Sequence, residues 1–480
     1  MKKFISTSLF ACSSLIALAQ STSLSEGGCG TVTTPQEIQE VYDFVKLPLS
    51  ARKTTGSDTI PLTIHIVGDD NGKGYYKLDN LFKVICELND HYAPTGFYFN
   101  VKFPIRFINN SSYYNHDYSS GFTMMTLNNV NNTVNMYFVQ DPGGNCGYYS
   151  PTGGAVAIGI NCGAPGNSTV AHELGHYFGL PHTFYGWEGR TSANPPTNPE
   201  FVTRGAGANC STAGDGFCDT DADYLSGRWN CPYSGTYADA NGDAYKPDGT
   251  NYMSYSNDAC TNHFSPMQMA RMQNTLATKY SRTPTTGGAT YMQLIAPALV
   301  YPTDKIYSNL TKVIWRKVNG AEAYQVSVVQ GLTNRIETVT TDTSLDISSL
   351  RFIENNNYSI TVTPLSGVNV CKTSSTAKSA SYTSELTTLS VNDVNNSNNL
   401  TIHPNPANSA LTVSMKDLGA GRYTLTMVGM NGQTVSNQEI SNSGTGTLVT
   451  IPVATLPAGM YFIRLVGVGY STVQKIMVQH

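Results

Sequence analysis

The segment at residues 172–182 constrains this chain more than any other, because it reads HELGHYFGLPH and sets three histidines at fixed spacing. Side chains four residues apart share one face of a helix, so His172 and His176 would aim their imidazoles at one point. We expect the helix to end at Gly179, because glycine adopts the left-handed conformation at little cost. That turn would bring His182 back to the same point.

Three imidazole nitrogens with an open fourth position are typical of a catalytic zinc ion. We therefore expect His172, His176 and His182 to bind Zn²⁺. Glu173 follows the first ligand directly, where its carboxylate can reach a water beside the ion without binding the ion, and it is the expected general base. The alternative is an amphipathic helix with two surface histidines, and the added glycine and third histidine make that coincidence roughly a thousand times rarer.

A second mark follows at residues 251–255, which read NYMSY. Together with the pattern HExxHxxGxxH it resembles the metzincin zinc peptidases. The resemblance implies that Met253 forms a hydrophobic floor under the ligands and that Tyr255 binds the metal or stabilises the oxyanion. A zinc hydrolase acting on other bonds is compatible with the first motif, but the second disfavours it.

Within the metzincins the chain resembles the pappalysin-like (cytophagalysin) group. The resemblance rests on HTF at 182–184, GDGFCDTDAD at 214–223 and NYMSYSNDACTNHFSPMQMARM at 251–272. It implies a zinc-dependent endopeptidase acting on protein or peptide substrates. Strand-like and helix-like segments alternate through residues 58–280, which favours an α/β (α+β) catalytic domain. We expect an extended substrate to pair along an edge strand at 154–161.

The N-terminus indicates export. Residues 1–19 are typical of a signal peptide, because Lys2 and Lys3 precede an apolar stretch ending in Ala17-Leu18-Ala19. A lipoprotein box at residues 9–12 is an alternative, but it leaves a very short apolar region and places Phe10 where a small residue is usual. No later stretch is long and apolar enough to span a bilayer.

Residues 20–57 are typical of a propeptide, with Cys29 in GGCGTV and a basic Ala51-Arg52-Lys53 near its end. The CGT text resembles the cysteine switch of the family, which implies that the Cys29 thiolate binds the zinc and keeps the enzyme latent. The propeptide would then inhibit its own enzyme until it is cut near Arg52. The arginine usual just before this cysteine is missing, since Gly27 and Gly28 stand there.

The rest of the chain is expected to be all-β. A Thr/Gly/Ser-rich linker at 281–291 leads to residues 292–385, which resemble a fibronectin type III module through the placement of Trp315, Tyr324, Leu345 and Tyr358. A second linker covers 386–399. We therefore predict a multidomain chain in which two β-sandwich domains follow the catalytic domain.

Residues 400–480 resemble the C-terminal sorting domain of type IX secretion cargo. The resemblance rests on HPNPAN at 403–408, GRYTLTMVGMNGQTV at 421–435, LPAGMYFIRLVG at 456–467 and VQKIMV at 473–478. It implies the type IX machinery as a partner and a secreted or cell-surface location reached through the periplasm. A second carbohydrate- or protein-binding sandwich is the alternative.

Nine cysteines follow the signal segment, an odd number that cannot all pair within one chain. Export permits disulfides, although spacing alone leaves their connectivity open. The resemblance to the pappalysin-like group implies the pairs Cys210–Cys231 and Cys218–Cys260, with Cys146–Cys162 as a local third. Cys86, on an expected helix at 78–92, is interpreted as a core residue.

Two loops gather side-chain oxygens, which suit Ca²⁺. The first holds Asp215, Asp219, Thr220, Asp221 and Asp223, and the second holds Asp239, Asn241 and Asp243. Neither is an EF-hand. The resemblance implies a calcium near the first loop, with Asp215, Asp219 and Thr220 as ligands, and a solvated acidic turn is the alternative.

The charge composition excludes some classes of binding partner. The net charge is −4, charged residues make up 13% of the chain and no run carries one sign, so neither nucleic acid nor an anionic membrane is an expected partner. An inactive adhesin that binds through its β-sandwiches is the alternative to an enzyme. Every catalytic position is filled, which argues against it.

Overall fold

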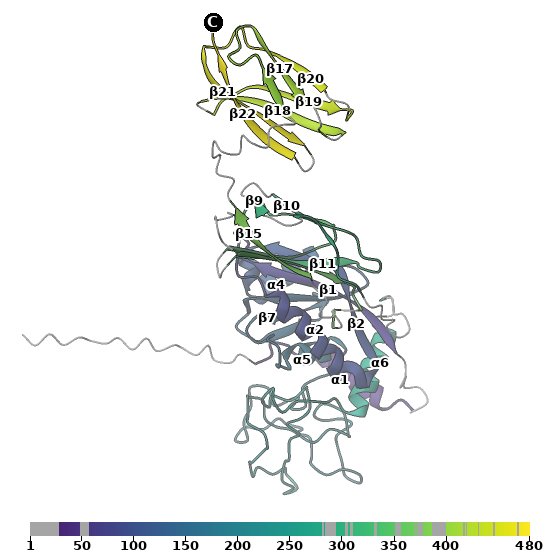
Figure 1. Ribbon diagram of the computed structural model, residues 1–480. Coiled ribbons are helices and arrows are strands. Elements are labelled where there is room, and N and C mark those ends of the chain that lie inside the picture. The colour runs from purple at the N-terminus through teal and green to yellow at the C-terminus, as the bar shows by residue number, and fades with distance from the viewer. Residues whose placement is uncertain are drawn as a thin grey trace, which may run out of the picture. The chain divides into compact units, whose positions relative to one another are not determined.

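The computed structural model describes residues 28–48, 57–280 and, with short gaps, 294–385 and 400–480. The expected signal peptide, the cleavage point near Arg52 and both linkers lie outside these residues, apart from Thr283 of the first linker, which the structure also describes. The chain divides into two compact units, residues 1–385 and 386–480, and Figure 1 colours them along the sequence. We name residues 57–280 the α/β region, 294–385 the first β region and 400–480 the tail.

The α/β region is built on a five-stranded sheet of order β2-β1-β4-β7-β6. Its strands are β1 (Asp58–Gly68), β2 (Phe97–Asn109), β4 (Val134–Val139), β6 (Gly147–Ser150) and β7 (Ala155–Gly159). All pairs are parallel except β6 with β7. The expected edge strand at 154–161 is therefore wrong, because β7 is paired on both sides and β6 is the edge.

Helices cover both faces of this sheet (Figure 1). They are α1 (Pro35–Val45), α2 (Leu78–Tyr92), the short 3₁₀ turn η2 (Ala93–Thr95), α3 (Ser111–Tyr114), α4 (Tyr118–Asn128), α5 (Thr169–Tyr177) and α6 (Pro266–Thr278). The predicted stripe of α2, from Leu81 to Leu88, is buried with Ile60 and Leu62 of β1. Met124 and Met125 of α4 pack with Val67 on the other face, as the alternation of a strand requires. Two short strands, β3 (Asn115–His116) and β5 (Asp141–Pro142), pair beside α4.

The segment between α5 and α6, residues 178–265, contains no helix or named strand, although the structure describes all of it. Aromatic residues fill its interior, with Trp187 surrounded by Tyr224, Tyr237 and Tyr245. Two disulfides tie it, Cys210–Cys218 and Cys231–Cys260. The expected pairs of these four cysteines are therefore wrong, whereas Cys146–Cys162 is confirmed.

The first β region contains two sheets, of order β13-β10-β8 and β12-β11-β14-β15-β9. Its strands are β8 (Leu299–Tyr301), β9 (Ile306–Tyr307), β10 (Lys312–Trp315), β11 (Ala323–Gln330), β12 (Asn334–Thr340), β13 (Ser344–Asp346), β14 (Asn357–Leu365) and β15 (Lys378–Glu385). Trp315 and Tyr324 are buried against each other in its core, with ring centroids 5.4 Å apart. The aromatic pattern thus marks the interior of a β structure.

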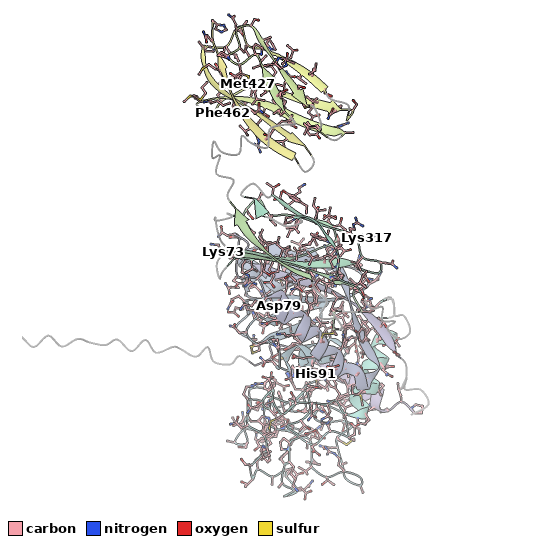
Figure 2. The ribbon with its side chains drawn as sticks, viewed as in Figure 1. Lys73, Asp79, His91, Lys317, Met427 and Phe462 are labelled. Carbon is pink, nitrogen blue, oxygen red and sulfur yellow. A yellow bond between two sulfur atoms is a disulfide. The ribbon has the colours of Figure 1, made fainter. Side chains whose placement is uncertain are left out.

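The first β region also packs onto the α/β region. Ala323, Val339, Leu365 and Val370 belong to the same continuous core as the α/β region. The backbone N–H of Val101 on β2 donates to the Gly367 carbonyl at 3.2 Å, so the module covers this edge of the sheet. Cys86 of α2 bonds to Cys371, which corrects the interpretation of Cys86 as a plain core residue. Gln325 donates to Asp79 at the start of α2, a residue labelled in Figure 2.

The tail has its own core. Its sheets have the orders β16-β17-β20 and β19-β18-β21-β22. The strands are β16 (Thr401–His403), β17 (Ala410–Met415), β18 (Gly421–Gly429), β19 (Thr434–Asn442), β20 (Thr447–Pro452), β21 (Gly459–Gly467) and β22 (Tyr470–Val478). Met427, labelled in Figure 2, is fully buried between them. Among the helices of the described residues, none has the length and apolarity needed to cross a membrane.

Candidate metal centre

The helix α5 and the turn after it position three histidines. Gly179 has a φ of +86°, a conformation that glycine adopts without strain, and the chain leaves the helix there as predicted. A Cβ on this glycine would also lie 2.9 Å from the Thr275 hydroxyl. His182 returns on the far side of the turn, so the local sequence alone explains why three ligands separated by ten residues meet.

The three histidines converge through their Nε2 atoms. Nε2 of His176 lies 3.1 Å from Nε2 of His172 and 3.1 Å from Nε2 of His182. Nitrogens bound 2.0–2.1 Å from one tetrahedral ion would be about 3.3 Å apart, so the donor set fits a metal. Burial lowers the pKa of His172 to about 4 and lowers the pKa of the other two, which keeps the imidazoles neutral as ligation requires.

Each Nδ1 atom has a partner that fixes the ring. His172 contacts the carbonyl oxygen of Tyr252 and His176 contacts that of Leu180, both at 2.7 Å. His182 contacts the carboxylate of Glu188 at 3.3 Å. The sequence pattern did not reveal Glu188, because it lies outside the motif on an irregular loop.

Glu173 is fully buried beside the histidines. Its Oε2 accepts hydrogen bonds from the Cys29 thiol at 3.3 Å and the Thr31 hydroxyl at 3.0 Å, and burial raises its pKa to about 8. Oε1 has no hydrogen-bond partner among the described residues. Gly147 on β6 lies directly over it, and a Cβ there would come within 2.9 Å of Glu173 Cγ. The absence of a side chain at Gly147 makes room for this carboxylate.

Met253 and Tyr255 both lie beside the histidines. Met253 is fully buried, and a Cβ on Gly175 of α5 would collide with its sulfur, so it packs closely under the ligand helix. The Tyr255 ring lies 5.0 Å from that of His182. Its hydroxyl donates to the Cys29 carbonyl at 3.1 Å and accepts from the Cys29 N–H at 3.0 Å.

The segment at residues 28–31 lies across the histidines as an added strand. Gly30 donates to the Gly147 carbonyl at 2.8 Å, and Cys146 donates to the Gly28 carbonyl at 3.1 Å, in a parallel pairing with β6. The Cys29 sulfur and the three histidine nitrogens lie within 4.8 Å of one another. Thr31, the last residue of the CGT text, accepts from the Tyr149 N–H at 2.8 Å and thereby fixes the segment over Glu173.

Helix α1 anchors that segment. Ile38, Val41 and Phe44 are buried in the main core. Glu40 pairs with Arg271 of α6 at 3.3 Å, and Arg271 also donates to the Gly179 carbonyl. The helix therefore packs against the elements that shape the metal site.

Of the three expected calcium ligands, the structure brings two together. Asp215 accepts from Thr220 at 3.0 Å, and both are buried. Asp219 instead caps α6, accepting from Ser265 and from the Met267 N–H at 2.8 Å. A buried residue missed by the sequence, Glu200, lies beside Asp215, and burial and that neighbour raise its pKa. In the second loop, both oxygens of the Asp239 carboxylate accept hydrogen bonds from backbone N–H groups.

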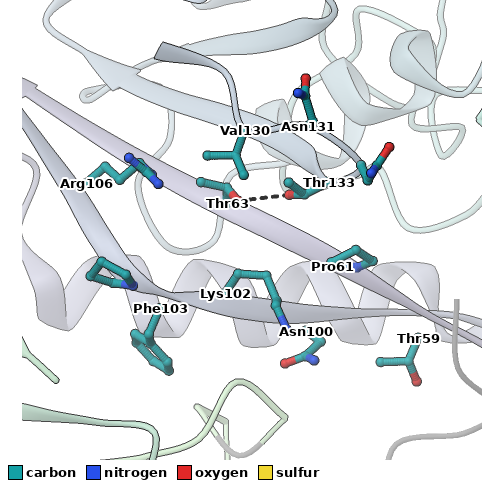
Figure 3. Close-up of a pocket in the computed structure, with 12 residues that line it drawn as sticks. Thr59, Pro61, Thr63, Asn100, Lys102, Phe103, Arg106, Val130, Asn131 and Thr133 are labelled. Atoms are coloured by element: carbon teal, nitrogen blue, oxygen red, sulfur yellow. Dashed lines mark hydrogen bonds between the residues drawn. The ribbon is translucent and has the colours of Figure 1, made fainter. Parts of the chain in front are cut away.

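A cavity lies elsewhere, along β1 and β2 (Figure 3). It measures about 470 Å³. Thr63 and Thr133 hydrogen-bond across it at 2.9 Å. Twelve residues line it: Thr59, Pro61, Thr63, Asn100, Lys102, Phe103, Pro104, Arg106, Val130, Asn131, Asn132 and Thr133. No residue of the metal site is among them.

Comparison with known proteins identifies two segments. Residues 154–277 match the family model described as pregnancy-associated plasma protein-A, and residues 401–479 match the model of a secretion system C-terminal sorting domain. The tail is therefore a type IX sorting domain, and the chain is secreted or displayed at the cell surface.

Curated relatives match about half of the chain. An extracellular metalloprotease of Colletotrichum graminicola is 31% identical over 45% of this chain and 74% of its own length. One of Pyricularia oryzae is 30% identical over 57% of this chain and 96% of its own length. A solved structure of mirolysin in complex with compound 9 aligns with a TM-score of 0.36 at 18% identity, over 48% of this chain and 96% of that one. The match to the family model and the two metalloprotease relatives show that the chain belongs to the pappalysin-like family and is a metalloendopeptidase.

Proposed function

We propose that this chain is made as a latent zymogen and, once its N-terminal segment is removed, hydrolyses peptide bonds of extracellular proteins at a Zn²⁺ ion held by His172, His176 and His182. The observation that supports this most is the convergence of three neutral Nε2 atoms beside the carboxylate of Glu173. When bound, Zn²⁺ polarises the scissile carbonyl and acidifies a water in the fourth position.

The side chains around the ion divide the proton transfers. Glu173 takes the proton of the attacking water on its carboxylate and delivers it to the nitrogen of the leaving amine. The Tyr255 hydroxyl is free to donate to the oxyanion once Cys29 has left. The Gly147 carbonyl and the Cys146 N–H, which now pair with residues 28–30, would pair with a substrate backbone instead.

Latency follows from the same contacts. The Cys29 sulfur lies within 4.8 Å of the three histidine nitrogens, where its thiolate would bind the ion, and its backbone is hydrogen-bonded to the Tyr255 hydroxyl. The Thr31 hydroxyl donates to Glu173, and the proton that the Cys29 thiol loses on binding the ion would pass to the same carboxylate, so the base is occupied as well. The segment therefore blocks the metal, the base and the edge strand together.

Replacing the general base tests the catalytic part. We expect Glu173→Ala to lower casein hydrolysis by the activated enzyme on the order of a thousandfold, with zinc content unchanged. Glu439→Ala, an exposed residue of the tail, is the control and should retain full activity. Full activity of Glu173→Ala, or an active parent enzyme without zinc, would refute this mechanism.

Latency is tested in the uncleaved chain. We expect Cys29→Ser to cleave a short peptide without processing, because serine is a weaker zinc ligand than a thiolate. Thr31→Val should raise the activity of the uncleaved chain less than Cys29→Ser does. Thr33→Val, two residues further on, should leave the chain inactive. An uncleaved Cys29→Ser chain as inactive as the parent would show that another contact maintains latency.

We also propose that Ca²⁺ binds at Asp215 and Thr220 together with Glu200, and not at Asp219. Oε2 of Glu200 is buried without a partner among the described residues, beside the carboxylate of Asp215. Two adjacent buried carboxylates are expensive unless cations or protons compensate them, and Arg204, which donates to Oε1 of Glu200 at 2.8 Å, supplies one positive charge for the two. Millimolar Ca²⁺ should raise the melting temperature of the parent but not that of Asp215→Asn, whereas Asp239→Asn should respond like the parent. Equal responses of all three would exclude this site.

A further inference from the structure

The third histidine differs from the other two in what holds its second nitrogen. Nδ1 of each of the first two ligands lies 2.7 Å from a backbone carbonyl oxygen. Nδ1 of His182 lies 3.3 Å from a carboxylate oxygen of Glu188. A carbonyl offers only a dipole, whereas a carboxylate offers a full negative charge, so His182 is the ligand whose donor strength a side chain controls.

Glu188 is held so that it can do this. Its other oxygen accepts from the Gly186 N–H at 2.7 Å, and Gly186 has a φ of +91°, which suits a tight turn. The residue between them, Trp187, is only 1% exposed and is packed among the aromatic side chains of this segment. Among the described residues, no lysine or arginine forms an ion pair with Glu188. Its side chain is 42% exposed, and the oxygen that is not bonded to Gly186 faces His182.

We propose that Glu188 is a positioning residue for the metal site. It holds His182 as the tautomer with the proton on Nδ1, which leaves the Nε2 lone pair toward the metal, and its charge strengthens that nitrogen as a ligand. The expected result is slower loss of the ion. The inference rests on the proposed function, because it assumes that Zn²⁺ is the ion bound there.

Metal retention, rather than activity, is the direct measurement. In the full chain loaded with zinc, we would follow release of the ion into excess chelator with a zinc-sensitive dye. We expect Glu188→Ala to release zinc 10–100 times faster than the parent. Glu188→Gln, which keeps an acceptor but loses the charge, should fall between them. The control is Glu87→Ala, since Glu87 also accepts a glycine N–H, that of Gly166 at 2.9 Å.

Thermal unfolding of the metal-free chains separates positioning from a structural role. A positioning residue changes zinc release while the metal-free melting temperature stays that of the parent. Equal release rates for Glu188→Ala and the parent would overturn the inference, and so would a fall in metal-free stability that accounts for the faster release. A Glu188→Gln chain that releases zinc like the parent would overturn the role of the charge. A parent chain that binds no zinc would instead refute the proposed function.

Discussion

The two β structures that follow the α/β region differ in how they are joined to the rest of the chain. The first β region shares a continuous core with the α/β region, supplies a backbone partner to β2 and is linked to α2 by a disulfide. The tail forms a separate compact unit around its own core. The two β segments therefore differ in role, since one packs as part of the peptidase and the other folds as a separate unit.

Truncation should give the largest contrast. A chain ending at Glu385 lacks the tail, and we expect its unit to melt like that unit in the full chain. A chain ending at residue 291 leaves Cys86 unpaired and exposes the apolar surface that Ala323, Val339 and Leu365 now cover. We expect it to be insoluble or to lose cooperative unfolding, which calorimetry of the soluble fraction would show. Cooperative melting of the shorter chain at the parent temperature would break the comparison.

Removing the disulfide between the two regions should have the next largest effect. Cys86 and Cys371 are 285 residues apart, and in the chain-entropy treatment a loop of that length contributes about 5.6 kcal/mol to the free energy of unfolding. The double variant Cys86→Ser/Cys371→Ser should lose much of this in denaturant titration, while the tail transition stays unchanged. A loss below about 1 kcal/mol would mean that packing alone joins the regions.

Acid should destabilise the first unit through His65. This residue of β1 is fully buried and stacks on Tyr137 at 4.1 Å, and burial lowers its pKa from 6.5 to about 4. The folded state thus disfavours the protonated form, so stability present above about pH 6.5 is lost as the pH falls toward 4, by about 3 kcal/mol. His65→Gln should flatten this part of the pH profile of unfolding. An unchanged slope would assign the acid sensitivity to other groups.

A single methyl group should give the smallest of these effects. A Cβ on Gly367 would collide with the Val101 carbonyl and the Asn100 side chain, at the point where the first β region meets β2. We expect Gly367→Ala to cost about 2 kcal/mol in unfolding. In the tail, a Cβ on Gly421 meets nothing closer than Tyr423 at 3.9 Å, so Gly421→Ala is the matched control. Equal effects of the two substitutions would show that the structure around Gly367 adjusts to the methyl group without loss of free energy of unfolding.

The sequence predicted the convergence of the three histidines because its determinants are local. The spacing of His172 and His176 and the turn at Gly179 follow from helix geometry, and the structure has both. Contacts between distant segments were predicted poorly. The pairing of Cys210 with Cys218 depends on the path of an irregular loop, which no periodicity encodes. Glu188 and Glu200 were missed for the same reason, while Thr31 could have been suspected from its place beside Cys29.

The hydrophobic pattern of the first β region predicts where it lies in the sequence but not what it packs against. The change from mixed to all-β patterning located it, and Trp315 and Tyr324 lie in its core as that pattern indicates. Yet the residues that dock it, such as Val339 and Leu365, alternate along strands like any other inward-facing residues. Whether such a face meets its own module or a neighbour is set by surfaces that are distant in the sequence.

The bond between Cys86 and Cys371 also sets an order in time. A chain that is synthesised and exported from its N-terminus presents α2 long before the residue that closes this bond, 285 positions later. The α/β region therefore lacks this disulfide until nearly all of the first β region has been exported. The first β region is therefore the last part of the peptidase to fold into place. A product of interrupted or truncated export would lack this region and its disulfide.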